Sequence, residues 1–403
     1  MMEKLQPKLR FPEFKDNWNK VKLKEVSQYF NGGSFENDVK EEGKYELITL
    51  KSVDMSGQLA HSRRYLDIEV PTLNKNTLIM ILSEQSPGLL GMTALIPTAN
   101  RYVLNQRVAE IRPYKTIDSY FLSLSINRNQ RYFSKLGAGT KVQNISKPNV
   151  ENFDFFKPSL PEQTKIASFL SSVDEKLNLL KEKKEALETY KKGMMQKIFS
   201  QELRFKDDDG NDFADWEEKS LGEVCTLITK GTTPKSFSSS GVNYIKTECF
   251  ENDFVNFSKC LYIDFNIHSK ELKRSQLEEN DILFAIAGSI GKVILVKPSI
   301  LPANTNQALA ILRLRKGENH YFILQVLKSD LMQIYIKENV SVGAQPNLNL
   351  EQMNLFSFFY PNTFEQTKIA DFLSAIDDKI TLVSTHIEEM LEYKKGLLQG
   401  MFC

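Results

Sequence analysis

The hexapeptide EQTKIA occurs twice in this chain, at residues 162–167 and again at residues 365–370. The similarity continues at the same offset of 203 residues, because Tyr190-Lys191-Lys192-Gly193 returns as Tyr393-Lys394-Lys395-Gly396. A constant offset over this distance indicates a duplicated unit. The chain must therefore fold as two related halves, and at 403 residues it is long enough for each half to bury a core of its own.

Each copy of the hexapeptide opens a long apolar pattern with steps of three and four residues. In the second copy the apolar positions are Ile369, Leu373, Ile376, Ile380, Val383, Ile387, Met390, Leu397 and Met401. In the first copy they are Ile166, Leu170, Val173, Leu177, Leu180, Leu187, Met194 and Ile198, with Lys184 and Lys191 interrupting them. This heptad period predicts two coiled-coil helices, each about 55 Å long at ~1.5 Å per residue.

The natural partner of each apolar helix is the other copy. The alternative is two long core helices of an ordinary domain, but such helices rarely exceed ~25 residues with a sustained seven-residue period. The first globular block leads into the first helix, the second block leaves its end, and the second helix starts from the second block. We therefore expect an antiparallel pair with pseudo-two-fold symmetry.

The ends of the chain fit into the same repeat. Leu9-Arg10-Phe11 and Trp18 return as Leu203-Arg204-Phe205 and Trp216, and the second group directly follows the first helix. If the C-terminus were joined to the N-terminus, the pattern would become a closed two-fold repeat. We therefore expect the two termini to lie near each other.

The blocks at about 20–160 and 216–363 contain short apolar runs that match each other. The runs 45–50 and 77–82 in the first block resemble 242–246 and 281–286 in the second, and helical stretches follow near 119–134 and 321–337. Short strands mixed with a few helices predict an α+β domain in each block.

Composition excludes several classes of protein. The chain is 41% hydrophobic and 26% charged with a formal net charge of +1, so an acidic polymer would have to bind to a local basic face. We expect a cytoplasmic protein without a membrane segment, because no long apolar run occurs and no signal peptide follows Met1. The four cysteines and four histidines lack ligand spacing, so we expect reduced thiols and no metal site.

Catalytic motifs are equally hard to find. The stretch Ala287-Gly288-Ser289-Ile290-Gly291-Lys292 is similar to a phosphate-binding Walker loop, but Ile286 stands where the first glycine is needed and Val293 where Ser or Thr is needed. We expect no catalytic residues in this chain.

The same stretch has a partner in the first block, Pro87-Gly88-Leu89-Leu90-Gly91-Met92. In both blocks an Asn-Gln pair follows, and further glycine-containing loops are duplicated at 31–34 with 231–235 and at 137–141 with 343–347. Such loops let backbone amides approach phosphates, and amide or basic side chains can read base edges. Taken singly, each glycine or Asn-Gln pair can equally serve a strand turn; taken together, the loops favour a binding surface.

This doubled order resembles the specificity subunit of type I restriction-modification enzymes. The order is loop, strand, G-x-x-G, Asn-Gln, helix, glycine loop, EQTKIA and long helix, and the resemblance covers essentially the whole chain. It implies an α+β fold with two target-recognition domains, at residues 1–160 and 201–363. Two conserved antiparallel helices, at 161–200 and 364–403, separate these domains and form a coiled coil.

The resemblance also implies partners. Each domain would read half of an asymmetric, interrupted sequence in double-stranded DNA, and two methyltransferase subunits would dock on the helices. Catalysis would belong to these subunits and to restriction/translocase subunits, which use S-adenosylmethionine, ATP and Mg²⁺; this chain would bind no cofactor. Met92 departs from the family pattern, because it replaces the lysine that Lys292 supplies in the second block.

Two sets of site residues follow. The residues expected at DNA are Lys51, Gly88, Gly91, Asn105, Gln106, Arg107 and Lys141 in the first block, and Lys246, Gly288, Ser289, Gly291, Lys292, Asn306, Gln307 and Gln345 in the second. The residues expected at the partner subunits are Gln163, Lys165, Tyr190, Lys191, Gln366, Lys368, Tyr393 and Lys394. Two other readings remain open at this point: a coiled-coil adaptor that binds proteins, and a self-contained nuclease.

Overall fold

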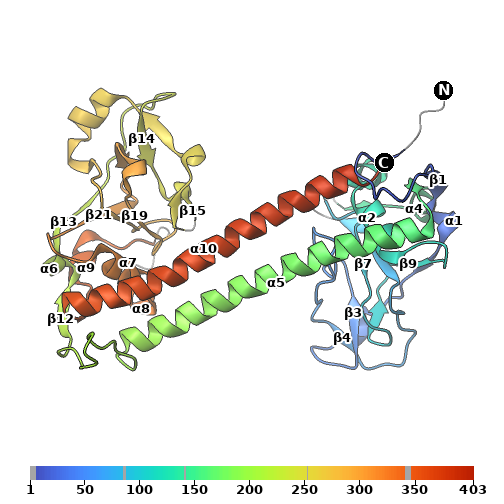
Figure 1. Ribbon diagram of the computed structural model, residues 1–403, viewed down its shortest axis with the longest axis horizontal. Coiled ribbons are helices and arrows are strands. Elements are labelled where there is room, and N and C mark those ends of the chain that lie inside the picture. The colour runs from blue at the N-terminus through green and yellow to red at the C-terminus, as the bar shows by residue number, and fades with distance from the viewer. Residues whose placement is uncertain (1–5, 85–87, 140–141, 252, 341–345) are drawn as a thin grey trace. The chain divides into compact units, whose positions relative to one another are not determined.

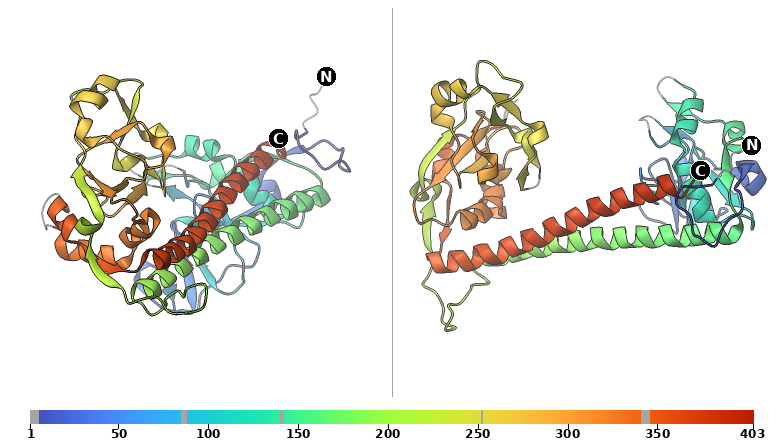
Figure 2. Two further views of the ribbon diagram at one scale, coloured as in Figure 1. Left: turned by 60° about the vertical axis from the view of Figure 1, so that its left-hand side comes forward. Right: turned by 45° about the horizontal axis from the view of Figure 1, so that its top comes forward.

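The computed structural model describes residues 6–84, 88–139, 142–251, 253–340 and 346–403 (Figures 1 and 2). Its contacts divide the chain into two compact units. The first domain comprises the chain up to Lys181 together with Thr385–Cys403, and the second domain comprises Glu182–Ser384. Each long helix thus gives one part to each domain. The domain boundaries expected at 160, 200 and 363 lie at the ends of the long helices, whereas the contacts divide the chain within these helices. The expected boundaries stay a prediction.

The two long helices are present. Helix α5 spans Leu160–Phe199 and α10 spans Thr363–Gly400, and the figures show both as uninterrupted coils. No helix in the described part of the chain is long and apolar enough to cross a membrane.

The first domain is built from short elements ahead of α5. They are β1 (Asn19–Lys22), α1 (Leu23–Val26), β2 (Ser27–Asn31), η1 (Glu36–Asp38), β3 (Tyr45–Ile48), β4 (Tyr65–Leu66), β5 (Leu78–Ile81), β6 (Ser83–Glu84), β7 (Thr93–Leu95), β8 (Tyr102–Leu104), β9 (Val108–Pro113), α2 (Ser119–Asn127), α3 (Gln130–Leu136), β10 (Gln143–Asn144), α4 (Lys147–Glu151) and β11 (Asp154–Lys157).

A four-stranded antiparallel sheet, in the order β2-β9-β5-β7, forms the middle layer of this domain. Side chains of successive strand residues point to opposite faces. In β5, Leu78 and Met80 accordingly pack with the helices, whereas Ile79 and Ile81 pack against the side that carries β8. On that side β3 pairs antiparallel with β4 and parallel with β8. The sheet therefore lies between a helical layer and a smaller sheet.

The second domain repeats this plan. Its elements are β12 (Glu217–Ser220), α6 (Leu221–Val224), β13 (Cys225–Lys230), β14 (Val242–Ile245), η2 (Thr247–Cys249), β15 (Phe250–Glu251), β16 (Phe254–Val255), η3 (Phe257–Lys259), β17 (Leu261–Ile263), η4 (Ile267–Glu271), η5 (Lys273–Ser275), β18 (Ile282–Ala285), β19 (Val293–Leu295), η6 (Pro298–Ile300), β20 (Ala303–Thr305), β21 (Leu309–Leu314), α7 (His320–Lys328), α8 (Asp330–Asn339), α9 (Leu350–Leu355) and β22 (Ser357–Tyr360). The sheet orders β13-β21-β18-β19 and β17-β14-β20 match those of the first domain strand for strand. The predicted α+β duplication is confirmed.

The helical stretch predicted in each block is divided in two. In the first domain α2 ends at Asn127, and in the second α7 ends before Ser329. Just after α2 the Asn129 side chain donates to the Ser125 carbonyl at 2.8 Å, and just after α7 the Ser329 hydroxyl donates to the Val326 carbonyl at 2.6 Å. Asn and Ser side chains compete in this way for backbone groups and break a helix that apolar periodicity alone would continue.

The duplicated hexapeptide holds the start of each domain. Glu162 in α5 accepts hydrogen bonds from Arg10 Nε at 2.7 Å and from Trp18 Nε1 at 3.3 Å. Glu365 in α10 does the same with Arg204 and Trp216, at 3.2 Å and 2.9 Å. Both carboxylates are buried, so an unpaired one would be strongly destabilising. The glutamate of the hexapeptide, and the arginine and tryptophan that bind it, are therefore the same in both halves of the chain.

The neighbouring glutamines are equally internal. The Nε2 atoms of Gln163 and Gln366 donate to the carbonyl oxygens of Pro158 and Pro361, both at 2.8 Å. Gln163 also accepts a bond from the Asp118 amide at 3.0 Å. These bonds fasten the loop before each long helix to the helix itself.

Two ion pairs set the pairing of α5 with α10. In the second domain Lys191 Nζ donates to both Asp377 carboxylate oxygens, at 2.6 Å and 2.7 Å. In the first domain Lys394 Nζ lies 2.5 Å from an oxygen of Asp174. The two pairs are equivalent, with the lysine on α5 in one and on α10 in the other. Residue 174 of α5 faces residue 394 of α10, and residue 191 faces residue 377, so the two helices run in opposite directions. The expected antiparallel arrangement is thereby confirmed within each domain.

The closed repeat is also visible at the chain ends. The Leu9 amide donates to the Gly400 carbonyl at 2.8 Å, just as the Leu203 amide donates to the Lys197 carbonyl at 3.0 Å. The residues that follow α10 complete the first core, where Phe402 stacks on Phe121 with ring centroids 5.2 Å apart. The end of the chain therefore lies beside its beginning, as predicted.

Removing the Phe402 ring should unfold the first domain more readily without affecting the second. For Phe402→Ala we expect a loss of about 3–5 kcal/mol, the usual effect of deleting a buried aromatic ring. Hydrogen exchange of the β5 and β9 amides, compared with those of β18 and β21, measures this. Phe199→Ala is the matched control and should instead speed exchange of the β18 and β21 amides in the second domain. Equal loss in both domains would contradict the assignment of the C-terminus to the first core.

Candidate nucleic-acid interface

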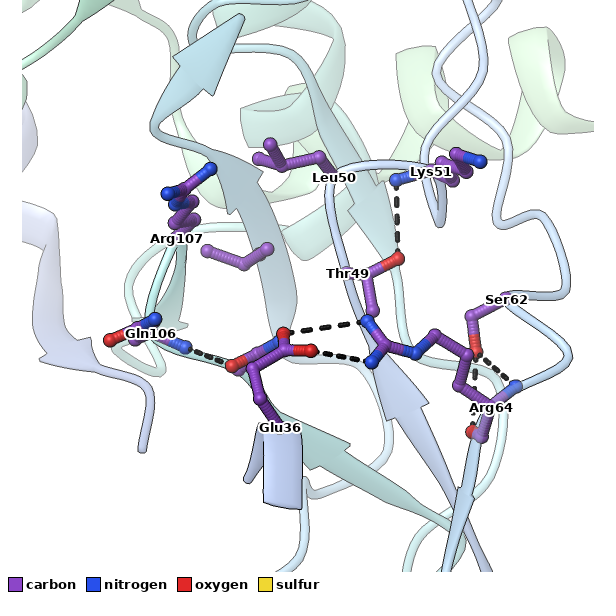
Figure 3. Close-up of a pocket in the computed structure, with 10 residues that line it drawn as sticks. Glu36, Thr49, Leu50, Lys51, Ser62, Arg64, Gln106 and Arg107 are labelled. Carbon is purple, nitrogen blue, oxygen red and sulfur yellow. Dashed lines mark hydrogen bonds and ion pairs between the residues drawn. The ribbon is translucent and has the colours of Figure 1, made fainter. Parts of the chain in front are cut away.

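The first domain has a cleft of about 620 Å³ beside its small sheet (Figure 3). The loop after β3, the η1 turn and the turn between β8 and β9 form its walls. Its lining residues are Glu36, Thr49, Leu50, Lys51, Ser62, Arg64, Asn105, Gln106, Arg107 and Val108. Four of the residues expected at DNA, Lys51 and the run from Asn105 to Arg107, are thus brought together, although more than fifty residues of the chain separate them.

Three of these four present free polar groups. Lys51, Gln106 and Arg107 are exposed, and their side chains have no hydrogen-bond or ion-pair partner among the residues that the structure describes. Such donors suit phosphate oxygens or base edges. The cleft therefore has the chemistry of a nucleic-acid contact surface.

Asn105 has a different role from the one expected. It is buried, its Oδ1 accepts the Gln106 amide at 2.8 Å, and its Nδ2 donates to Glu36 Oε1 at 2.9 Å. In the second domain Asn306 Oδ1 accepts the Ala308 amide at 3.2 Å. Asn side chains commonly hold turns in this way. These two residues shape the turn that presents their neighbours, and a direct DNA contact through the Asn105 side chain does not fit.

Sequence reasoning missed Glu36 and Arg64. Arg64 Nη2 lies 2.5 Å from Glu36 Oε2, and Figure 3 shows Glu36 between Arg64 on one side and Arg107 with Gln106 on the other. The Arg64 guanidinium, and then the Asn105 amide, hold the pKa of Glu36 below its usual range. The cleft therefore contains a fixed carboxylate at neutral pH. An isolated Glu and Arg, far apart in the sequence, carry no recognisable pattern.

In the first domain a glutamate side chain binds the backbone amides of the G-x-x-G loop. Oε2 of the buried Glu84 accepts hydrogen bonds from the amides of Gly88, Leu89 and Leu90, at 2.9, 2.7 and 2.8 Å. A phosphate has no amides left to bind there and would meet a negative charge. The DNA contact expected at Gly88 therefore does not fit this loop. Met92, which stands where the second domain has Lys292, is buried.

Gly91 and Gly291 serve the hairpin turn itself. Their φ angles are +79° and +89°, which side chains with a Cβ rarely adopt, and a Cβ on Gly91 would lie 2.3 Å from the Phe133 ring. Their amides donate to the carbonyls of Ile81 and Ala285, at 2.8 Å and 3.0 Å. The turn, and not a ligand, accounts for glycine at both positions.

In the second domain the corresponding loop lacks an acid. Gly288 and Ser289 are exposed, and among the described residues no carboxylate accepts their amides. Lys292 is also exposed and has no ion-pair partner in the described chain. Exposed amides next to a free lysine can bind an anion, so this loop keeps the phosphate-binding chemistry expected for it.

The remaining contacts expected in the second domain are weaker. Lys246 Nζ lies 3.9 Å from Glu248, and the Thr233 hydroxyl donates to Gln307 Oε1, which leaves the Gln307 amino group as a donor. Ala308 stands where the first domain has Arg107. Lys141 and Gln345 lie outside the described residues.

Most residues expected at partner subunits are engaged within the chain. Gln163, Gln366, Lys191 and Lys394 make the internal bonds described above, and burial lowers the pKa of Lys191 while the facing Asp377 opposes this. Their side chains do not fit a docking contact. Lys165 pairs with Glu13, and Lys368 with Asp208 at 2.7 Å, near the surface.

The two tyrosines of the set remain available. Tyr190 and Tyr393 are 51% and 52% exposed at equivalent positions of the helices. A large exposed ring at the same place in both copies has no role in the internal packing.

Known proteins share this organisation. The family described as type I restriction modification DNA specificity domain matches residues 15–189 and again 214–393. The MjaVIII specificity subunit of Methanocaldococcus jannaschii is 25% identical, covering 97% of this chain and 92% of the relative. The EcoBI specificity subunit of Escherichia coli is 23% identical, covering 88% and 78%.

Solved structures have a similar fold. The type I restriction-modification S subunit from M. genitalium superposes with a TM-score of 0.66 at 18% identity, covering 99% of both chains. A chain from a study of complex assembly in a type I R-M system gives a TM-score of 0.56 at 17% identity, covering 96% of this chain and 97% of that one.

Lys292 provides a direct test of the loop in the second domain. If its ammonium neutralises one phosphate, Lys292→Ala should lower the slope of log affinity against log salt for duplex DNA by about 0.9. Anisotropy titrations with the full chain at several salt concentrations measure this. Lys316→Ala, an exposed lysine in the turn before α7, is the matched control. An unchanged slope for the Lys292 variant would make it an ordinary surface lysine.

Proposed function

The chain belongs to the type I restriction-modification DNA specificity family, and from this premise we propose how its two domains share the reading of one DNA site. It is a specificity subunit with two DNA recognition domains. Each domain binds one half of an asymmetric, interrupted sequence in double-stranded DNA. The paired helices set the spacing between the halves.

One observation carries this proposal: the two domains have the same topology but different polar groups at the equivalent loops. The first has Arg107 where the second has Ala308, and Met92 where the second has Lys292. Glu84 fills the amide loop of the first domain, whereas the second domain has no acid there. Equal scaffolds with unequal surfaces suit the reading of two different half-sequences.

The long helices support the role of a spacer. Each is continuous, and the Lys–Asp pairs fix how α5 and α10 register against each other in both domains. A helix has a fixed rise of ~1.5 Å per residue, so helix length can define a length along DNA. Half-sites about 34 Å apart lie one helical turn apart on the same face of the duplex.

The chemistry in this proposal belongs to partner subunits. An adenine methyltransferase that uses S-adenosylmethionine docks on the helical region, and two copies are proposed because Tyr190 and Tyr393 offer equivalent exposed positions. Restriction/translocase subunits that use ATP and Mg²⁺ complete the complex, which acts on DNA in the cytoplasm. The specificity subunit contributes no catalytic residue.

Methylation mapping tests the proposal. The chain is expressed with its modification subunit, and adenine methylation is mapped across the host genome by single-molecule sequencing. One interrupted, asymmetric motif that requires this chain is the expected result. An active methyltransferase that gives no new motif, despite a stable complex, would refute DNA reading and favour a protein-binding adaptor.

Replacing residues 20–160 by the corresponding block of a relative should change one half of the motif only. The reason is that each domain has its own core and its own loops. The same methylation map measures the outcome, and replacing residues 216–363 is the reciprocal control. A change in both halves after a single exchange would contradict the modular reading.

Inserting four residues in both α5 and α10, between the domains' ion pairs, should alter the preferred spacer and leave both half-sequences unchanged. Each helix would lengthen by about 6 Å, close to one turn. Motif mapping reports the spacer and the half-sequences separately. New half-sequences would argue against the helices acting as a spacer.

A further inference from the structure

The cleft of the first domain combines free cations with a fixed carboxylate. Lys51 and Arg107 line its walls with exposed side chains, and the Glu36 side chain remains 47% exposed between Arg64 and Arg107 (Figure 3). A surface that only held phosphates would gain nothing from a carboxylate, since like charges repel. The presence of Glu36 in this cleft therefore requires another explanation.

Glu36 is held in one place and keeps accepting capacity. Its oxygens accept from Asn105 Nδ2 at 2.9 Å and from both terminal nitrogens of Arg64, at 3.4 Å and 2.5 Å. A carboxylate can accept about four hydrogen bonds. At least one further donor can therefore bind to it from the cleft, while Arg64 neutralises its charge toward nearby phosphates.

The groups of the cleft complement one base pair better than the others. In the major groove guanine presents the acceptors O6 and N7, and cytosine presents the amino donor N4. Arginine and lysine donate to the first, and a carboxylate accepts from the second. An A·T pair would instead set the thymine methyl group against charged side chains.

We propose that this cleft reads a G·C base pair, with Arg107 and Lys51 donating to guanine and Glu36 accepting from the cytosine amino group. The proposal rests on the proposed function and specifies one part of the half-site read by the first domain. Asn105 and Arg64 are positioning residues that hold the Glu36 carboxylate toward the base.

The second domain lacks the counterparts of Arg107 and Glu36. Ala308 replaces Arg107, and no Asp or Glu occurs between Gly231 and Gly241, the segment that corresponds to the Glu36 loop. The G·C reading therefore applies to one half-site only. The other half-site of the same molecule serves as an internal control.

The test uses the full chain in complex with its modification subunit. Adenine methylation is mapped for the wild type and for Glu36→Gln and Arg107→Ala. Both variants should lose discrimination at the same G·C position of one half-site, by about fivefold to a hundredfold, since a base contact is worth ~1–3 kcal/mol. The other half-site and the spacer should stay unchanged. Glu42→Gln and Arg131→Ala, exposed residues of the same domain, should leave the motif intact.

Three outcomes would overturn the proposal. One is a half-site for the first domain that contains no G·C pair. Another is an Arg107→Ala variant with an intact motif but a lower salt slope, which would make Arg107 a phosphate contact. The third is relaxation at different positions in the two variants. If Glu36→Gln fails to fold, the motif of the Arg107→Ala variant still tests the proposal, because Arg107 is exposed. A wild-type chain that directs no motif at all would refute the proposed function itself, which is a separable result.

Discussion

Each domain depends on a helix end that comes from the other half of the sequence. Phe402, just after the end of α10, packs into the first core, and Phe199 at the end of α5 packs into the second. This exchange works only if the two helices meet in one register. The pairs Lys191–Asp377 and Lys394–Asp174 supply that register, because a shift along the helix would leave partly buried charges unmatched.

Lys191 and Lys394, which stand in the apolar seam, thus have a structural role. Polar residues in a coiled-coil core reduce stability but select one alignment. Here the same pair occurs twice with the helices exchanged, so one sequence unit specifies both ends of the arrangement. Glu162 and Glu365 act similarly at the helix starts, where each binds an arginine and a tryptophan from the preceding segment.

The surfaces follow a different rule from the cores. Positions that hold the fold are repeated between the domains, whereas the exposed groups at the candidate DNA surface differ. In the first domain two carboxylates, Glu36 and Glu84, take positions beside groups that would otherwise bind phosphate. In the second domain Lys292 and exposed amides remain free in the described chain. The groups of the first domain therefore fit the base reading that we propose, and the free lysine and amides of the second fit the phosphate contact that we propose.

The sequence by itself determined the duplication, the two long helices, the α+β class and the proximity of the chain ends, because periodicity and repeat spacing depend only on local order along the chain. It also selected Lys51 and Arg107 as residues expected at DNA, and the structure places both in one cleft. Only the tertiary structure decided which repeated polar residues are internal, such as Gln163 and Asn105, and which are exposed, such as Gln106 and Tyr190. It alone brought Glu36 to Arg64 and Glu84 to its loop amides. The first pairing depends on how distant segments pack, and the second on the exact path of a loop, and no periodic pattern of residues records either of them.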